Sequence, residues 1–342
     1  MDTVPPFRRD LVVAGASAGG VEALRTMVAG LPADFPAAVV VTMHLGAGTH
    51  SALARILDRV GPLPATTACH GAPIEPGTVQ VAPPDRHLLT EDGRLILTRG
   101  PTENGHRPAV NATFRSAALT RGPRVIGVIL SGALDDGAAG LRAIVDRGGL
   151  AVVQDPADAL YSGMPENALA VVDTEHVAPA AEIGAVLDKL VRLPVEPFEV
   201  PSPPDALLLE DRIAREAVRL GALTPAQRSA GSGYTCPDCQ GSLTEVDPAG
   251  RYRCRIGHAW SAPALLDAHS GEFQLALMKA LRALDEKVAL VRKLAAQASA
   301  RRPRGLAERY TASAREAADA AETLRRFLLD ATREAAADPA SG

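Results

Sequence analysis

The chain has 342 residues, a formal net charge of −4, 46% hydrophobic residues and 3% aromatic residues. This length predicts roughly two domains with a real core, and the mild acidity and few aromatic rings argue against nucleic-acid binding. Four cysteines exclude a disulfide scaffold and indicate a reducing compartment. No apolar run reaches the about 18 residues of a membrane helix, and the run after Arg9 is too short for a signal peptide. We therefore expect a cytoplasmic protein without membrane insertion.

Short apolar runs alternate with helical patterns over residues 1–192. Predicted strands are Leu11–Ala14, Ala37–Met43, Thr78–Ala82, Val125–Leu130 and Leu150–Gln154, and predicted helices lie near Val21–Leu31, Ser51–Val60, Val110–Arg121 and Ala138–Arg147. Because most of these apolar runs are continuous, we expect strands covered on both faces. The pattern predicts one α/β domain with a doubly wound, mainly parallel sheet. Asp92-Gly93 predicts a hairpin of His87–Thr90 and Arg94–Thr98.

The composition changes three times after residue 192. Prolines cluster in residues 193–233, which predicts an extended linker with one amphipathic helix near Ala206–Leu220. Residues 234–262 form a compact Cys/His segment, and residues 263–336 contain two helical stretches before a disordered tail at 337–342. Residues at heptad-like spacing predict a helical hairpin or small coiled coil, which permits self-association. They are Leu277, Leu281, Leu284, Val288 and Val291, then Leu306, Tyr310, Ala317, Leu324 and Ala331.

Polar residues follow three of the predicted strands. Gly15-Ala-Ser17-Ala-Gly19 satisfies G-x-S-x-G, a sharp turn that presents a serine hydroxyl beside a helix N-terminus. His44 follows the second strand, and Asp135 and Asp136 follow the strand at Val125. The carboxyl ends of parallel strands share one edge, so these side chains can meet as nucleophile, base and orienting carboxylate. Each also has a structural explanation: a packed or phosphate-binding turn, a hydrogen-bonded loop histidine, or a helix N-cap.

Several motifs taken together resemble the catalytic domain of chemotaxis protein-glutamate methylesterases, the CheB family. They are Gly15–Gly20, Thr42–Leu45, Val81–His87, His106–Val110, Ile129–Gly132, Asp136–Gly140 and Ser162–Pro165. The resemblance implies Ser17 as nucleophile, His44 as general base and Asp136 as orienting carboxylate, with the backbone N–H groups of Ala18 and Ala133 holding the oxyanion. It implies hydrolysis of glutamyl methyl esters on methyl-accepting chemoreceptors or similar helical proteins, with release of methanol and no catalytic cofactor.

The chain departs from the usual family pattern at several positions. Ala133-Leu134 stands where the family usually has Met-Gly, and Asn111 stands where an aspartate is common. About ten residues precede the first strand, so the resemblance implies a form without an N-terminal phospho-receiver domain.

Other charged and titratable residues are candidates for the surroundings of this site. His87 and His106 match family motifs and are expected to line the cleft. Arg107, Arg115 and Arg121 are candidates for docking an acidic substrate face, with ordinary solvated arginines as the alternative.

The Cys/His segment contains Cys236-x-x-Cys239 and, fourteen residues later, Cys254-x-x-x-His258. Four such ligands can close a tetrahedron around zinc, and so short a segment needs that support to fold. We predict a zinc-ribbon-like module with one structural zinc; free buried thiols and a redox C-x-x-C pair are the alternatives. The segment also resembles a C-terminal extension of some receiver-less homologues, a likeness that implies no role.

Two other functions remain open on the same sequence. The fold can serve a signalling or adaptor protein that mainly binds partners, although such a protein has no need of an intact Ser/His/Asp set. The same three residues can also serve a glutamine deamidase or a broader esterase.

Overall fold

The computed structural model describes residues 7–44, 51–195, 199–216, 231–247, 250–300 and 304–337. The chain divides into two compact units, Met1–Leu265 and Leu266–Gly342, each of which is considered by itself. Within the described ranges, no helix combines the length and apolar character that crossing a membrane requires.

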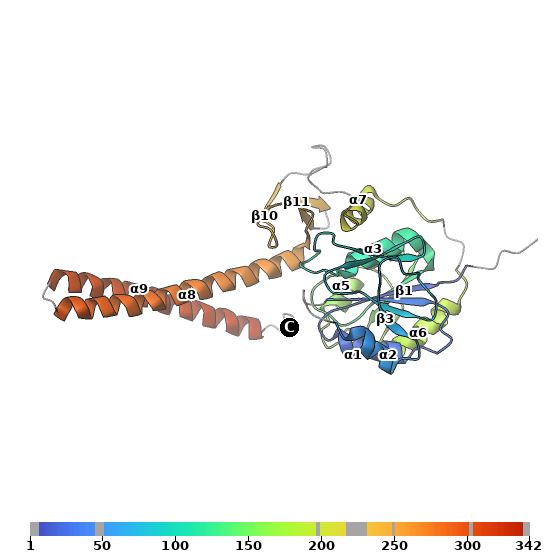
Figure 1. The fold of residues 1–342 in the computed structure, drawn as a ribbon, viewed down its shortest axis with the longest axis horizontal. Coiled ribbons are helices and arrows are strands. Elements are labelled where there is room, and N and C mark those ends of the chain that lie inside the picture. The colour runs from blue at the N-terminus through green and yellow to red at the C-terminus, as the bar shows by residue number, and fades with distance from the viewer. Residues whose placement is uncertain are drawn as a thin grey trace, which may run out of the picture. The chain divides into compact units, whose positions relative to one another are not determined.

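A sheet flanked by helices forms the centre of the first unit (Figure 1). It has seven strands in the order β3-β4-β2-β1-β7-β8-β9. Its strands are β1 (Leu11–Ala16), β2 (Ala38–Met43), β3 (Ala65–Thr67), β4 (Val79–Val81), β7 (Val125–Ile129), β8 (Leu150–Gln154) and β9 (Val177–Ala178). Every neighbouring pair is parallel. Strand β1 lies between β2 and β7, so the strand order reverses beside it and the carboxyl edge there is a topological switch point.

Helices cover both faces of the sheet, which confirms the predicted doubly wound architecture (Figure 1). One face packs against α1 (Gly20–Ala29), α2 (Leu53–Val60) and α6 (Ala180–Arg192), and the other against α3 (Val110–Arg121), α4 (Ala138–Asp146) and α5 (Gly163–Val171). Along β1 the side chains alternate between the two cores, Val12 in the first and Val13 in the second. A two-stranded hairpin of β5 (His87–Glu91) and β6 (Arg94–Thr98) and a short 3₁₀ helix (Gly122–Arg124) complete this part.

The segment after α6 packs onto the α/β domain as part of the same unit. Helix α7 (Asp205–Ala214) is shorter than the predicted amphipathic helix, and residues 217–230 lie outside the described ranges. A four-stranded antiparallel sheet follows, made of β10 (Gly231–Thr235), β11 (Ser242–Asp247), β12 (Arg251–Cys254) and β13 (Ala259–Ser261). We call residues 231–261 the ribbon.

The second unit is a hairpin of two long helices, α8 (Ala262–Ala300), which begins at the end of the first unit, and α9 (Arg304–Ala337) (Figure 1). Both predicted helices are confirmed, and the residues at 277, 281, 284, 288 and 291 are the less exposed side of α8. In α9 the prediction of Leu306 as a seam residue is wrong, because Leu306 is exposed. Ala317 is buried as predicted, together with Ala307, Ala314 and Ala321. The side chain of Ala331 and the tail at 338–342 lie outside the description.

Candidate active site and metal cluster

Ser17, His44 and Asp136 come together at the switch point, although they are far apart in the sequence. The Nδ1 atom of His44 lies 3.0 Å from Oγ of Ser17, and its Nε2 atom lies 2.6 Å from Oδ2 of Asp136. Asp136 accepts a hydrogen bond from Nε2–H of His44, which leaves the Nδ1 lone pair directed at the serine hydroxyl. This is the geometry that a serine nucleophile needs, with the base oriented by a carboxylate.

The turn that presents Ser17 is fixed by small residues and by Ser131. Gly19 adopts a left-handed φ of 71° just before α1, and a Cβ there would come 2.6 Å from Oγ of Ser131. The Ser17 amide donates to the carbonyl of Ser131, and the Ser131 hydroxyl donates to the carbonyl of Ala18. A Cβ on Gly132 would collide with Met164. Larger side chains at these glycines would therefore push the turn away from β7.

Helix α3 provides the environment of the Asp136 carboxylate. The backbone N–H groups of Val110 and Asn111, in the first turn of α3, donate to Asp136 at 2.7 and 3.0 Å. Burial alone would raise the pKa of Asp136, but the hydrogen bond and charge of His44 and these two amides outweigh it and hold that pKa below its ordinary value. Asp136 is therefore ionised although it is almost fully buried.

Asn111, where an aspartate is common in the family pattern, has a defined partner. Its side-chain oxygen accepts a hydrogen bond from the Gly140 amide at 2.7 Å, in the first turn of α4. An amide oxygen can satisfy this donor as a carboxylate would, so the departure at this position leaves the helix end paired.

The two histidines of the family motifs lie in different places. His106 stacks on His44, with ring centroids 3.7 Å apart and planes at 12°. Burial and the charge of His44 lower the pKa of His106 to about 4. His87 is fully buried instead, with Nε2 at 2.9 Å from the Pro101 carbonyl and Nδ1 accepting from the Ala109 amide. The prediction that His87 lines the cleft is wrong. The buried His87 ring is hydrogen-bonded to the backbone of the segment between β6 and α3.

The two predicted oxyanion donors lie on loops that flank Ser17. Among the described residues, neither the Ala18 nor the Ala133 amide has a hydrogen-bond partner, so both can donate to a substrate oxygen. Leu134 adopts a left-handed φ of 60°, a conformation that glycine adopts more readily. The loop is held there by the Asn167 side chain, which donates to the Leu134 carbonyl.

The predicted docking role of Arg115 is wrong, because this arginine is buried. It pairs with Glu103 at 2.6 Å and with Glu210 of α7 at 3.3 Å, and Arg253 of β12 lies within 3.6 Å of both carboxylates. We call these four residues the buried ion cluster. Arg107 pairs with Asp85 and Arg121 with Asp10, so both are engaged in ion pairs at the surface. No local sequence pattern indicates this cluster, because its four members come from four separate segments.

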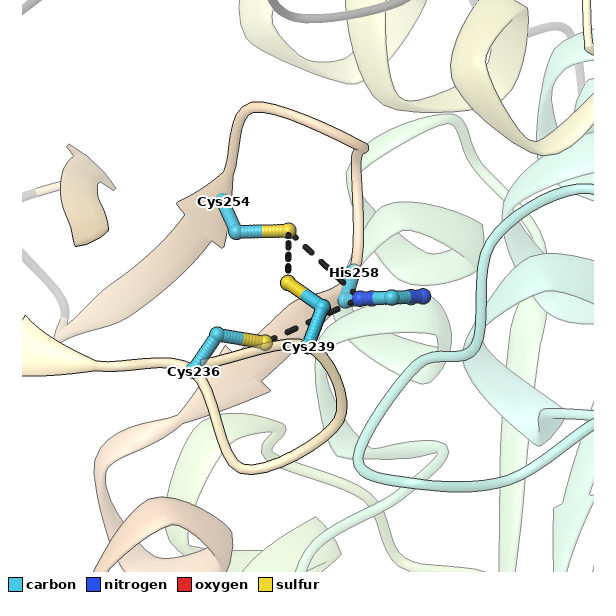
Figure 2. Close-up of side chains that lie close together, drawn as sticks. All are labelled: Cys236, Cys239, Cys254 and His258. Carbon is cyan, nitrogen blue, oxygen red and sulfur yellow. Dashed lines mark hydrogen bonds between the residues drawn. The ribbon is translucent and has the colours of Figure 1, made fainter. Parts of the chain in front are cut away.

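Cys236, Cys239, Cys254 and His258 converge at one end of the ribbon (Figure 2). Their ligand atoms all lie within 4.8 Å of one another, with 3.6 Å between Sγ of Cys239 and Cys254 and 3.5 Å from Sγ of Cys254 to Nδ1 of His258. A tetrahedral zinc site with bonds of about 2.3 Å sets its ligand atoms about 3.7 Å apart, so the residues present fit such an ion. We call this group the Cys/His cluster.

A serine, a histidine and a carboxylate at the switch point of a parallel α/β sheet define the class of serine hydrolases. Residues 12–187, about half of the chain, match the family described as CheB methylesterase. This chain belongs to the CheB methylesterase family. Helix α7, the ribbon and the helical hairpin lie outside the matched residues.

Known relatives agree with this assignment. The protein-glutamate methylesterase/protein-glutamine glutaminase 2 of Anaeromyxobacter dehalogenans is 40% identical over 185 residues, 54% of each chain. The protein-glutamate methylesterase FrzG of Myxococcus xanthus is 39% identical over 184 residues, 54% of this chain and 55% of FrzG. The chain thus spans about half the length of these relatives. The CheB methylesterase catalytic domain of Thermotoga maritima is 33% identical with a TM-score of 0.52, covering 54% of this chain and 100% of that domain.

Proposed function

We propose that this protein hydrolyses γ-methyl esters of glutamyl side chains on methyl-accepting chemoreceptors or similar helical proteins. Ser17 Oγ attacks the ester carbonyl while Nδ1 of His44 takes the hydroxyl proton. The Ala18 and Ala133 amides donate to the oxygen on which negative charge develops. His44 then protonates the leaving methoxide, methanol departs, and water hydrolyses the acyl-serine to restore the glutamate.

The observation that carries this proposal is the chain of contacts from Ser17 Oγ through the His44 ring to the buried, ionised Asp136. A protein that used the fold only to bind partners would have no need of these Ser17–His44–Asp136 contacts. We therefore rank the adaptor hypothesis below the hydrolase. Deamidation of glutamine is the other candidate, because the Anaeromyxobacter relative carries the glutaminase name as well. The same attack on a primary amide would release ammonia.

Replacing Ser17 tests the proposal directly. The substrate is a helical receptor fragment that carries glutamyl methyl esters, and the readout is methanol release. We expect Ser17→Ala to lower turnover by at least about 10³-fold while substrate binding stays within a few fold, because the nucleophile is lost and the binding surface is not. The exposed Cys69→Ser variant is the matched control. Near wild-type turnover in Ser17→Ala would refute the assignment, and ammonia release from the unmethylated fragment separates deamidation from ester hydrolysis.

We further propose that the Cys/His cluster holds one structural zinc ion. Four protein ligands would close its coordination, so the ion would stabilise the ribbon and leave no position for substrate. The three sulfurs and the imidazole are the donor set that zinc prefers. Metal analysis of the purified protein is expected to give about one equivalent of zinc, and less than roughly half an equivalent would contradict the proposal.

A further inference from the structure

The ribbon is joined to the catalytic domain by main-chain pairing. Strand β13 pairs with β12 on one side and with residues 102–104 of the catalytic domain on the other. The Ala259 amide donates to the Thr102 carbonyl at 3.0 Å, and the Asn104 amide donates to the Ala259 carbonyl at 2.8 Å. A segment of the catalytic domain thus adds an isolated parallel bridge, Glu103 to Ala259, at the β13 edge of the ribbon sheet.

The residues of the Cys/His cluster stand directly beside this pairing. His258 immediately precedes Ala259, and Asp238, between Cys236 and Cys239, accepts a hydrogen bond from the Thr102 hydroxyl at 2.6 Å. Gly257, with a φ of 112°, lies against the same segment, because a Cβ there would come 2.9 Å from Cγ of Pro101. Both ligand-bearing turns of the ribbon therefore contact the catalytic domain at Pro101 and Thr102.

This segment leads straight to the catalytic side chains. The backbones of Glu103 and His106 pair with each other at 3.1 and 2.9 Å, and the His106 ring stacks on His44. A second path runs through Ser261, whose hydroxyl donates to Asp135 at 2.7 Å and whose amide donates to the Asn104 side chain at 2.9 Å. Asp135 directly precedes Asp136. Strand β13 thus contacts the neighbours of both the base and its orienting carboxylate.

We propose that the metal-loaded Cys/His cluster and Ser261 are positioning elements of the catalytic site. The loaded cluster fixes β13, β13 fixes residues 102–106 and Asp135, and these hold His44 and Asp136 in line with Ser17. This inference rests on the proposed hydrolase function and on metal binding by the cluster. A module that served only stability would lower the amount of folded enzyme upon metal loss, whereas a positioning module lowers the turnover number of the folded enzyme.

The expected loss of kcat upon metal removal follows from how strongly the rate depends on the positions of the catalytic groups. An error of about 1 Å in the position of a catalytic group can cost about 10²-fold in rate. Substrate touches Ser17 and the flanking loops rather than β13 in this scheme. Loss of the metal is therefore expected to lower kcat by about 10–10²-fold and to change KM by less than about twofold.

The test compares the full-length protein with zinc bound, after chelation, and after zinc is returned. We expect kcat on the methylated receptor fragment to fall upon chelation and recover with zinc, with KM nearly unchanged. Hydrogen exchange of the amides of residues 101–107 is expected to quicken in the chelated protein. The control Cys69→Ser should behave as wild type. Unchanged kcat and unchanged exchange after chelation would overturn the proposal.

A second variant leaves the metal in place, in case chelation unfolds the ribbon and its surroundings. Ser261→Ala with zinc bound is expected to lower kcat by about 3–10-fold, and Ser261→Thr, which keeps the hydroxyl, to restore most of it. Equal activity of Ser261→Ala and wild type would overturn the role of Ser261. If the zinc-loaded wild type releases no methanol, the proposed function fails. The hydrogen exchange of the amides of residues 101–107 then still shows whether the metal-loaded cluster keeps this segment in place.

Discussion

Asp136 keeps its charge in a nearly water-free position because three N–H groups donate to it, one from the His44 ring and two from the first turn of α3. Asp136 in turn selects the tautomer of His44, because an ionised carboxylate only accepts hydrogen bonds and the ring nitrogen that faces it, Nε2, must therefore carry the hydrogen. One carboxylate thus sets both the orientation and the protonation of the proposed base.

Asp136→Asn is expected to lower kcat by about 10³–10⁴-fold without unfolding the protein, because an asparagine can donate its amide to Nε2 and leave the proton on Nδ1. Nδ1 could then no longer accept the Ser17 proton. Steady-state methanol release measures the effect, and Asp146→Asn, at an exposed ion pair on α4, is the control. A variant within tenfold of wild type would show that Asp136 does not orient the base.

His106 makes stability depend on pH. Its pKa falls from 6.5 to about 4 in the folded protein, because burial and the charge of His44 disfavour protonation. As the pH drops from about 6.5 to about 4 the unfolded chain binds a proton that the folded chain does not, so stability is full above this window and declines within it. His106→Asn is expected to reduce the decline between pH 7 and pH 4.5 by about 2 kcal/mol, as measured by urea titrations at the two pH values. An unchanged decline would contradict the lowered pKa.

At the scale of elements, the buried ion cluster joins helices α3 and α7 to strand β12. Glu103 has a pKa below its ordinary range: its burial is outweighed by the charges of Arg115 and Arg253. Glu103 has only Arg115 and Arg253 beside it in the cluster, whereas Glu210 also pairs with Arg251 at 2.8 Å. Removing one guanidinium group leaves a buried carboxylate short of a partner, which destabilises the fold.

Arg115→Met is therefore expected to destabilise the protein by about 3–5 kcal/mol, because it leaves two buried carboxylates short of a partner. Arg142→Met removes an exposed ion pair on α4 and should cost less than about 1 kcal/mol. Urea unfolding of both variants measures the difference. Equal urea unfolding midpoints for Arg115→Met and Arg142→Met would mean that the buried ion cluster does not stabilise the packing of α7.

The sequence predicted the elements that carry local signals. The continuous apolar runs of β1, β2 and β7 and the polar residues after them placed Ser17, His44 and the Asp135-Asp136 pair at one edge, because parallel strands end on the same side. The family resemblance, not the pattern, selected Asp136. Strands β3 and β9 were missed because two or three residues carry no periodic pattern. Helices α5 and α6 were also missed.

Contacts between distant segments left no such signal. Arg115 looked like a surface residue, because nothing near it in the sequence shows that Glu103 and Glu210 surround it. The pairing of residues 102–104 with Ala259 joins positions that are far apart in the chain, and main-chain pairing does not depend on side-chain identity. The Cys and His spacing identified the candidate metal ligands, but it did not indicate that the ribbon packs against residues 101–104 of the catalytic domain.

At the scale of the whole molecule, the first unit extends well beyond the residues that match the family, because it ends at Leu265 and the match ends at residue 187. The linker expected between separate domains instead contributes Glu210 to a buried site. Catalytic domain, α7 and ribbon therefore form one compact unit, and we expect it to unfold as one.

Two truncations test this unit. A chain ending at Leu265 keeps Glu210 and β13 and is expected to retain ester hydrolysis within a few fold and most of its thermal stability. A chain ending at Val195 loses both, leaves Arg115 and Glu103 partly unpaired and opens the edge at residues 102–104. Its melting temperature is expected to fall by at least about 5 °C. Circular dichroism and methanol release compare the two truncated chains. Equal melting temperatures would show that α7 and the ribbon do not stabilise the catalytic domain.

The main-chain bridge between β13 and residues 102–104 also limits how this architecture can be inherited. A recombination event that moved α7 and the ribbon onto another hydrolase would bring Ala259 and Ser261 without the segment that accepts them, and Glu210 without Arg115. Chimeras between homologues should therefore work when the crossover exchanges residues 101–115 together with residues 205–261, and should fail when only one of the two blocks is exchanged.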